Sequence, residues 1–325
     1  MAGNLLAGRR ITDRFRPDRS AFSVYSEGFS SPFHPKAFMP ALITPSPTVL
    51  RCDLEYEVMT PSHFIFHIQC AYSPDQYVVR ESLVLTPSLA LQPSWDPVSG
   101  NRIFRCNVQP GTLQVRYDAT VQISRATAVG GDHESDVAQI PDHVLPYLMP
   151  SRFCPSDTMS QETQRLFGQV PRGRQRVEYI CQWIRDNIAY QIGTSHPTTT
   201  ALDAYNQQAG VCRDFAHLTI TFCRALNIPA RLVGGYCHFE EPPQDFHAVV
   251  EVWLGDRWIM FDPTLLALPG NIVRVATGLD AKNTAFATMY GSMMMTHMHI
   301  QVSHEGVAAL DNPDPIQATV RRFGT

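Results

Sequence analysis

The sequence lacks any long apolar run. No stretch of its 325 residues approaches the roughly 20 consecutive apolar residues that cross a bilayer. The first thirty residues also lack the apolar core of a secretory signal. We therefore expect a soluble protein of the cytoplasm that has no membrane partner.

Basic residues are not in excess, and lysine is nearly missing. Only Lys36 and Lys282 are lysines among 26 basic residues, and the formal net charge is -4. Nucleic-acid-binding proteins need a surplus of cations to neutralise phosphates. The charge balance therefore predicts that nucleic acid is not a partner.

The eight cysteines include no Cys-x-x-Cys pair, and they are widely and irregularly spaced. This spacing fits neither a zinc ribbon nor a small disulfide framework. We therefore predict unpaired thiols, no cofactor and no metal, in a reducing compartment where a reactive thiol can persist.

The pattern of residues changes along the chain and predicts two folded units. Residues 1–48 are rich in arginine, serine and proline, which is typical of an irregular leader. Residues 49–128 alternate apolar and polar positions between Pro- and Gly-containing turns, which predicts a β-sandwich-like domain. Residues 129–160 have the glycines and prolines that are typical of a linker. Residues 161–325 contain apolar positions at helical spacing, so the whole chain is predicted to be of the α+β class.

Cys212 is the candidate nucleophile, because it lies where a strong helical pattern begins. Phe215, Leu218 and Phe222 keep helical spacing after it. The unpaired N–H groups and the dipole of a helix start favour an anion, and therefore the thiolate that attacks carbonyl groups. Gly210 would let a substrate backbone approach the sulfur.

His247 and Asp262 are the candidate base and its orienting carboxylate. They flank a predicted hairpin in which Trp253 faces Trp258, so both residues fall on one face, as diagonal neighbours. A slip of one residue in this register would separate them. His217, five residues after Cys212, points elsewhere on the helix and is expected at its surface or at the edge of the core.

Two other interpretations stay open. His297 and His299 share one face of an alternating strand and could contribute to a metal site, although no third ligand is evident. The chain could also be a binding or scaffold protein that keeps the fold without turnover. Alkylation confined to Cys212 would favour the enzyme, because a scaffold has no reason to activate one thiol.

Three blocks of the sequence resemble the bacterial transglutaminase-like proteins, a family that includes cysteine proteases. The blocks are Thr199–Asp203 leading to Gly210–Leu218, Ala225–Arg231 followed by Gly234–Tyr236, and Asp245–Ala248 with Trp258–Thr264. The resemblance is strong over residues 160–305 and weaker over 50–125. One departure is Leu279, where the family frequently has an arginine before Asp280 and Ala281.

The resemblance implies a papain-like catalytic domain, in which a helix bearing Cys212 packs on an antiparallel sheet bearing His247 and Asp262. It implies that this triad transfers acyl groups from a peptide or protein amide. Hydrolysis, by a cysteine peptidase or amidase, is favoured over transamidation to an amine. Tyr190 is a candidate second donor to the oxyanion.

Overall fold

The computed structural model describes residues 47–124 and 131–304, so nearly all of the predicted leader lies outside the described residues. No described helix is long and apolar enough to cross a membrane. Within the described part, helices and antiparallel sheets are both present, which confirms the predicted α+β class.

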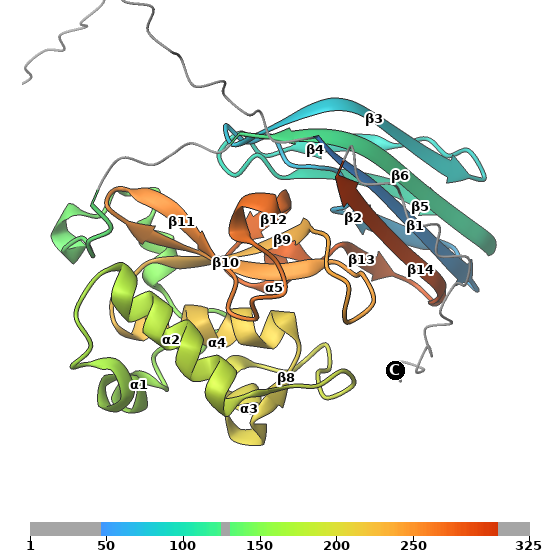
Figure 1. The fold of residues 1–325 in the computed structure, drawn as a ribbon. Helices are drawn as coiled ribbons and strands as arrows, with labels where there is room; N and C mark the ends of the chain where they lie inside the picture. Colours follow the sequence, from blue (N-terminus) through green and yellow to red (C-terminus); the bar gives the residue numbers. More distant parts are fainter. Residues whose placement is uncertain (1–46, 125–130, 305–325) are drawn as a thin grey trace, which may run out of the picture. The chain divides into compact units, whose positions relative to one another are not determined.

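Two four-stranded antiparallel sheets form the amino-terminal β-sandwich (Figure 1). One has the strand order β14-β1-β6-β3, and the other β13-β2-β5-β4. Their strands are β1 (Thr48–Val58), β2 (Ser62–Phe66), β3 (Gln76–Thr86), β4 (Gln92–Trp95), β5 (Arg102–Val108), β6 (Gly111–Ile123), β13 (Ala287–Tyr290) and β14 (Met293–His304).

Alternation along these strands produces the core of the sandwich. In β1, every second residue is buried, as expected for a strand with one face on a core and the other toward solvent. Tyr56, Phe64, Phe66 and Phe104 meet inside, with ring centroids 5.0–6.1 Å apart. The predicted β-sandwich is therefore confirmed.

The predicted linker is held to the second unit by ion pairs over the residues described, from 131 onward. It contains two short 3-10 helices, η1 (Val137–Gln139) and η2 (Leu145–Leu148). The Asp132 carboxylate pairs with Arg174 and Arg257, while Glu134 accepts from Arg172 at 2.9 Å. The linker is therefore a packed segment.

The second unit is a four-stranded antiparallel sheet, β11-β10-β9-β12, with helices packed on it (Figure 1). A two-stranded parallel ladder, β7-β8, lies beside the helices. Its elements are α1 (Ser160–Phe167), α2 (Arg174–Asn187), β7 (Ala189–Tyr190), α3 (Ala201–Gln207), β8 (Ala209–Gly210), α4 (Cys212–Ala225), β9 (Ala230–Tyr236), β10 (His247–Leu254), β11 (Arg257–Phe261), η3 (Pro269–Asn271), β12 (Val273–Gly278) and α5 (Ala281–Thr284).

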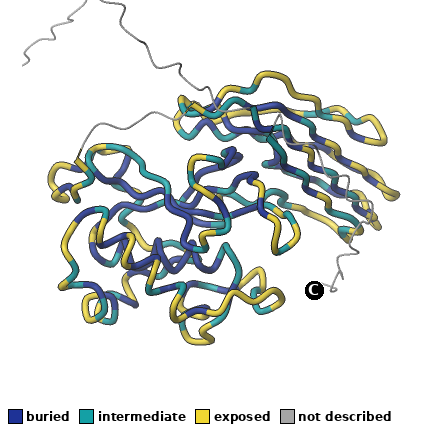
Figure 2. The backbone as a smooth tube through the Cα atoms, viewed as in Figure 1, coloured by how far each residue is buried: buried dark blue, intermediate teal, exposed yellow. Residues whose placement is uncertain are grey.

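Helix α4 is the central helix of this unit. Every residue from Asp214 to Arg224 is buried, because α1, α2 and α3 contact it on one side and the sheet on the other. Buried segments accordingly run through α4 and the middle strands (Figure 2). The apolar stripe of α2, which includes Val177, Ile180 and Ile184, is buried against α4.

The last two described strands leave the second unit and return to the sandwich. Strand β13 pairs with β2, and β14 pairs with β1 along its whole length. This differs from the predicted boundary, which assigned everything from 161 to 325 to the catalytic domain. The physical reason is that β1 has a free edge, which β14 covers with backbone hydrogen bonds.

Candidate active site

Cys212 is the first residue of α4, as the sequence predicts. The Val211 N–H donates to the Asp214 Oδ2 at 2.9 Å, so Asp214 closes the start of the helix. Cys212 is partly exposed, whereas the other seven cysteines are buried and all eight are unpaired. The chain therefore has a single thiol that an external reagent or substrate can reach, and it is placed at a helix start.

The β10–β11 hairpin has the predicted register. Trp253 pairs with Trp258, and Glu251 with Met260, around the turn at residues 255–256. Strand β10 begins at His247, and Asp262 directly follows β11. The His247 Nε2 lies 2.9 Å from the Asp262 Oδ2, so the predicted contact between them is present.

Asp262 is held from several directions. Its Oδ1 accepts from the Thr264 backbone N–H at 2.9 Å and from the Thr264 hydroxyl at 2.6 Å. Its Oδ2 also accepts from the Ala267 N–H at 2.9 Å. Burial opposes ionisation, but the hydrogen bonds from His247, Thr264 and Ala267 outweigh it and lower the pKa of Asp262.

His247 contacts both the thiol and the carboxylate. Burial disfavours the imidazolium, yet the hydrogen bonds to Asp262 and Cys212 prevail and raise the pKa of His247 to about 10. Because Nε2 is bound to Asp262, Nδ1 is the ring nitrogen left for the sulfur. The ring is therefore held next to both the thiol and the carboxylate, which is the arrangement that proton transfer to and from a nucleophile requires.

Tyr190 also lies beside the sulfur. The parallel pairing of β7 with β8 sets Tyr190 against Gly210, two residues before Cys212. Burial, the charge of Cys212 and a hydrogen bond to it raise the pKa of the Tyr190 hydroxyl, so this group stays a protonated donor. The structure thus brings all four predicted site residues together.

Gly210 has a packing role in addition to the predicted one. A Cβ atom at this position would lie 2.7 Å from the Asp214 Cβ, which is closer than real atoms approach. Asp214 in turn accepts from the Ser195 hydroxyl at 2.9 Å, and the Arg213 Nη2 donates to the same hydroxyl at 2.6 Å. These contacts tie the loop after Tyr190 to the start of α4.

The prediction for His217 was wrong in one respect, because this residue is fully buried rather than at the helix surface or the core edge. Its ring stacks on Phe153 at 5.3 Å, and its Nε2 accepts from the Ala281 N–H at 3.1 Å. Nδ1 therefore carries the proton, and it has no hydrogen-bond partner among the described residues. A partner distant in sequence, the segment around Ala281, buries the ring.

Asp280, next to Leu279, supports the backbone. It is 1% exposed and accepts from the N–H groups of Phe153 and Lys282, each at 2.9 Å. The Leu279 carbonyl accepts from the Arg224 Nη2 at 2.6 Å. This segment is therefore fixed to α4 through its main chain, without the arginine that the family frequently has at 279.

The histidine pair on β14 lies away from this site. His297 faces Glu55 and His299 faces Asp53 across the β1–β14 ladder. Each carboxylate already has a donor, Gln114 for Glu55 and Arg116 for Asp53. Over residues 47–124 and 131–304, no group of three or more His, Cys, Asp or Glu side chains is placed to hold a metal ion.

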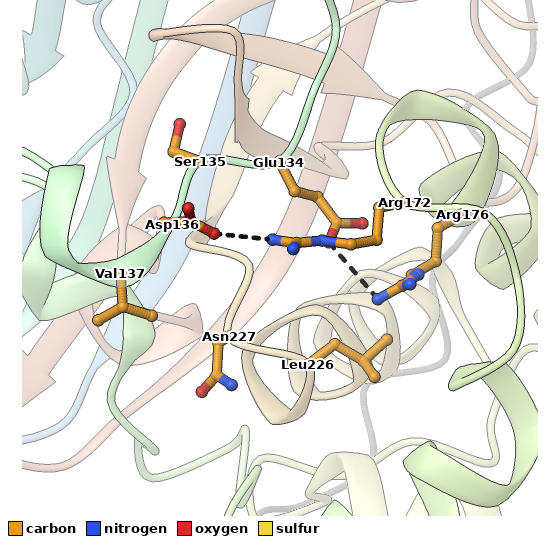
Figure 3. A pocket seen from close by; sticks show the side chains of 8 residues that line it. All are labelled: Glu134, Ser135, Asp136, Val137, Arg172, Arg176, Leu226 and Asn227. Carbon is orange, nitrogen blue, oxygen red and sulfur yellow. Dashed lines mark hydrogen bonds and ion pairs between the residues drawn. The ribbon is translucent and has the colours of Figure 1, made fainter.

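A separate cavity of about 270 Å³ lies between the linker and the ends of two helices (Figure 3). Its lining residues are Glu134, Ser135, Asp136, Val137, Arg172, Arg176, Leu226 and Asn227. The guanidinium groups of the two arginines pair with the carboxylates of Glu134 and Asp136, so the charges of the lining residues compensate one another. It contains no thiol and none of the predicted site residues.

Sequence reasoning missed two residues that shape the site. Thr264 could have been found, because an Asp-Pro-Thr segment favours side-chain bonding within a turn. Phe239, whose ring lies 5.7 Å from that of His247, gave no local signal. Its contact depends on how the chain folds back between β9 and β10.

Comparison with known proteins agrees with this architecture. Residues 161–263 match the model of the transglutaminase-like superfamily, and residues 49–141 match the bacterial transglutaminase N-terminal domain. A crystal structure from Cytophaga hutchinsonii, described as a "putative cysteine protease", superposes with a TM-score of 0.76 at 33% identity, covering 80% of this chain and 91% of that one.

A second similar protein is an uncharacterized protein of Mycobacterium leprae (strain TN), 31% identical over 149 residues. The match covers 42% of this chain, and the chain spans about half, 52%, of that relative's length. The chain therefore belongs to the transglutaminase-like superfamily and carries a bacterial transglutaminase N-terminal domain ahead of the core.

Proposed function

We propose that the protein is a thiol-dependent enzyme that hydrolyses amide bonds of peptides or proteins through Cys212, His247 and Asp262. One observation carries the proposal. The single partly exposed thiol lies at a helix start, beside an imidazole whose pKa it helps to raise and whose Nε2 lies 2.9 Å from a buried carboxylate.

In the first half of the reaction, the Cys212 thiolate attacks the amide carbonyl carbon, and an S–C bond forms. The negative charge develops on the carbonyl oxygen, and in this proposal the Cys212 backbone N–H and the Tyr190 hydroxyl donate the hydrogen bonds that stabilise it. As the C–N bond breaks, the His247 imidazolium donates its proton to the leaving amine. The product of this half is a thioester and a free amine.

In the second half, neutral His247 accepts a proton from water as the water oxygen attacks the thioester. The carboxylic acid leaves, and the thiolate–imidazolium pair re-forms. Asp262 keeps the imidazole oriented in both halves. The cysteine protease description of the Cytophaga structure, at 33% identity, supports water as the acceptor. The proposal includes a reducing cytoplasm, where the thiol persists.

Mass spectrometry of a peptide library tests the proposal, with wild type and Cys212→Ala compared with and without a primary amine. Fragments that appear with wild type alone would support hydrolysis. Amine incorporation that depends on Cys212 would show that the reaction is transamidation instead of hydrolysis. Identical spectra for both proteins would overturn the enzyme assignment and favour a scaffold.

Cys181→Ala is the matched control, because Cys181 is a buried thiol on α2. This variant should retain the wild-type spectrum if it folds, which circular dichroism checks. Loss of turnover in a folded Cys181→Ala protein would contradict the assignment of Cys212 as the nucleophile.

A further inference from the structure

The segment between β9 and β10, residues 237–246, leads directly into His247 and contacts it. Cys237 and Phe239 are buried in a small apolar cluster with Val249 and Ile272. The Phe239 ring lies 5.7 Å from the His247 ring, tilted by 58°. The inner side of this segment therefore packs against the base.

The outer side of the same segment binds strand β14. The Gln244 Oε1 accepts from the Val302 N–H at 2.7 Å, and the His238 Nδ1 lies 2.9 Å from the Val302 carbonyl oxygen. A carbonyl oxygen only accepts, so the His238 Nδ1 carries the proton and donates it. The Gln244 Nε2, 3.1 Å from that nitrogen, is then a packing contact rather than a donor.

Val302 is a suitable anchor because β14 is an edge strand among the strands that the structure describes. It pairs with Leu50 of β1 on one side, and β14 ends the sheet order. In an antiparallel ladder, the N–H and C=O of one residue point to the same side. The N–H and the C=O of Val302 both face the open edge, where no described strand pairs with them. The side chains of His238 and Gln244 bind these two groups in place of a strand.

An aromatic contact fixes the end of the segment. Phe246, the residue before His247, stacks on Phe286 with ring centroids 4.8 Å apart and planes 9° from parallel. Its ring also lies 5.1 Å from that of Tyr236. Phe286 directly precedes β13, so this contact too connects the base to a strand of the sandwich.

We infer that the β-sandwich orients the catalytic base: strand β14 holds residues 237–246 through His238 and Gln244, and Phe239 and Phe246 transmit that position to His247. The inference rests on the proposed function, since it assigns the two polar side chains as positioning residues for its base. Displacement of a reacting group by about 1 Å can cost about 10²-fold in rate.

The experiment compares Gln244→Ala with Gln244→Glu, which keeps an acceptor for the Val302 N–H. Gln114→Ala is the matched control, because Gln114 also bonds across this sheet, to the Glu55 Oε2 at 2.9 Å. Steady-state kinetics gives kcat and KM, and hydrogen exchange reports the amides of residues 238–246.

We expect Gln244→Ala to lower kcat by about 10-fold or more, with little change in KM and faster exchange over residues 238–246. Gln244→Glu should recover most of kcat, and Gln114→Ala should match wild type. Exchange rates in Gln244→Ala equal to those of wild type would overturn the inference that Gln244 holds this segment on β14. Faster exchange with unchanged kcat would overturn the positioning role.

Failure of the proposed function can be distinguished from failure of this inference. If wild type shows no turnover that depends on Cys212, the alkylation rate of Cys212 becomes the readout, because it depends on the imidazole without needing a substrate. Slower alkylation in Gln244→Ala than in Gln114→Ala would support the inference that β14 positions His247 through this segment. Equal rates would overturn that inference.

Discussion

At the scale of single residues, the eight thiols have two kinds of environment. Burial raises the pKa of Cys52, Cys70, Cys154 and Cys181 to about 12 and that of Cys106 to about 11. It raises the pKa of Cys223 and Cys237 as well. Only Cys212 combines partial exposure with a helix start and an adjacent imidazole.

Alkylation should therefore be selective. We expect iodoacetamide at neutral pH to modify Cys212 at least about 10-fold faster than any other thiol, because the thiolate is the reacting species. Peptide mapping by mass spectrometry measures this. Unfolded protein, in which all eight cysteines should react alike, is the control, and comparable rates in the folded protein would contradict the expectation.

The pKa of His247 gives a prediction for alkaline pH. It rises from an ordinary 6.5 to about 10, so the imidazolium stabilises the folded state. That contribution is complete below about pH 6.5 and is lost as pH rises through about 10, by at most roughly 1.4 kcal/mol per pH unit. Urea unfolding of wild type and His247→Gln should show it as a steeper alkaline decline in wild type. Parallel declines would contradict it.

His217 has the opposite behaviour. Burial, with repulsion from Arg213 and Arg224, lowers its pKa to about 3. Between pH 6.5 and about 3, the unfolded chain then binds a proton that the folded chain does not. The free energy of unfolding therefore decreases as the pH is lowered through this range, by at most roughly 1.4 kcal/mol per pH unit. His217→Gln, which can still accept from the Ala281 N–H, should lose this slope in urea unfolding. An unchanged slope would refute the assignment.

At the scale of secondary-structure elements, the start of α4 depends on a small residue and a cap. Gly210→Ala would push on Asp214 and disturb its bonds to Val211 and Ser195. We expect a loss of about 1–2 kcal/mol in the free energy of unfolding, the usual range for a lost cap. Chemical denaturation measures it.

Gly234→Ala is the control for this prediction. A Cβ at Gly234 would meet only ordinary contacts, the nearest being the Thr284 carbonyl oxygen at 3.6 Å. Its stability should stay within about 0.5 kcal/mol of wild type. Equal losses in the two variants would show that the Asp214 contact is not the cause.

Local sequence signals predicted the elements that carry the site. The glycine and aspartate at 255–256 fixed the hairpin register, and that register placed His247 and Asp262 together. Helical periodicity placed Cys212 at a helix start. No local signal could place Phe239 on His247 or bury His217, since both contacts depend on residues that only the tertiary fold brings near.

At the scale of the whole described chain, a partly buried cation connects the sheet of the catalytic unit to the sandwich. The Arg274 side chain bonds the fully buried Glu251 at 2.6 Å and lies 3.2 Å from Asp75 of the sandwich unit. Arg231 is the second partner of Glu251, at 2.6 Å. Burial opposes ionisation of Glu251, but the two arginines outweigh it and lower its pKa.

Arg274→Met should therefore be costly, because it leaves a buried carboxylate with one partner. We expect a loss of about 3–5 kcal/mol in the free energy of unfolding. Arg51→Met removes an exposed pair with Asp118 and should cost no more than about 1 kcal/mol. Denaturant unfolding of the two variants decides this, and similar losses would contradict the role given to Arg274.

The carboxyl boundary of the catalytic unit was beyond local reasoning. Met293 to His304 alternates like any strand, and such a pattern says which face is buried but not which strand pairs with it. Pairing with β1 joins residues about 250 positions apart, as Thr48 and His304 show. Only the free edge of β1 in the folded sheet selects that partner.

This long-range pairing has a consequence for biosynthesis. Strand β1 is synthesised before the catalytic core, whereas β14, the strand that pairs with its edge, is synthesised only after that core. During that interval the nascent sandwich exposes an unpaired edge, the kind of surface on which strands of other chains aggregate. The edge of β1 is therefore protected only after residues 293–304 have been synthesised.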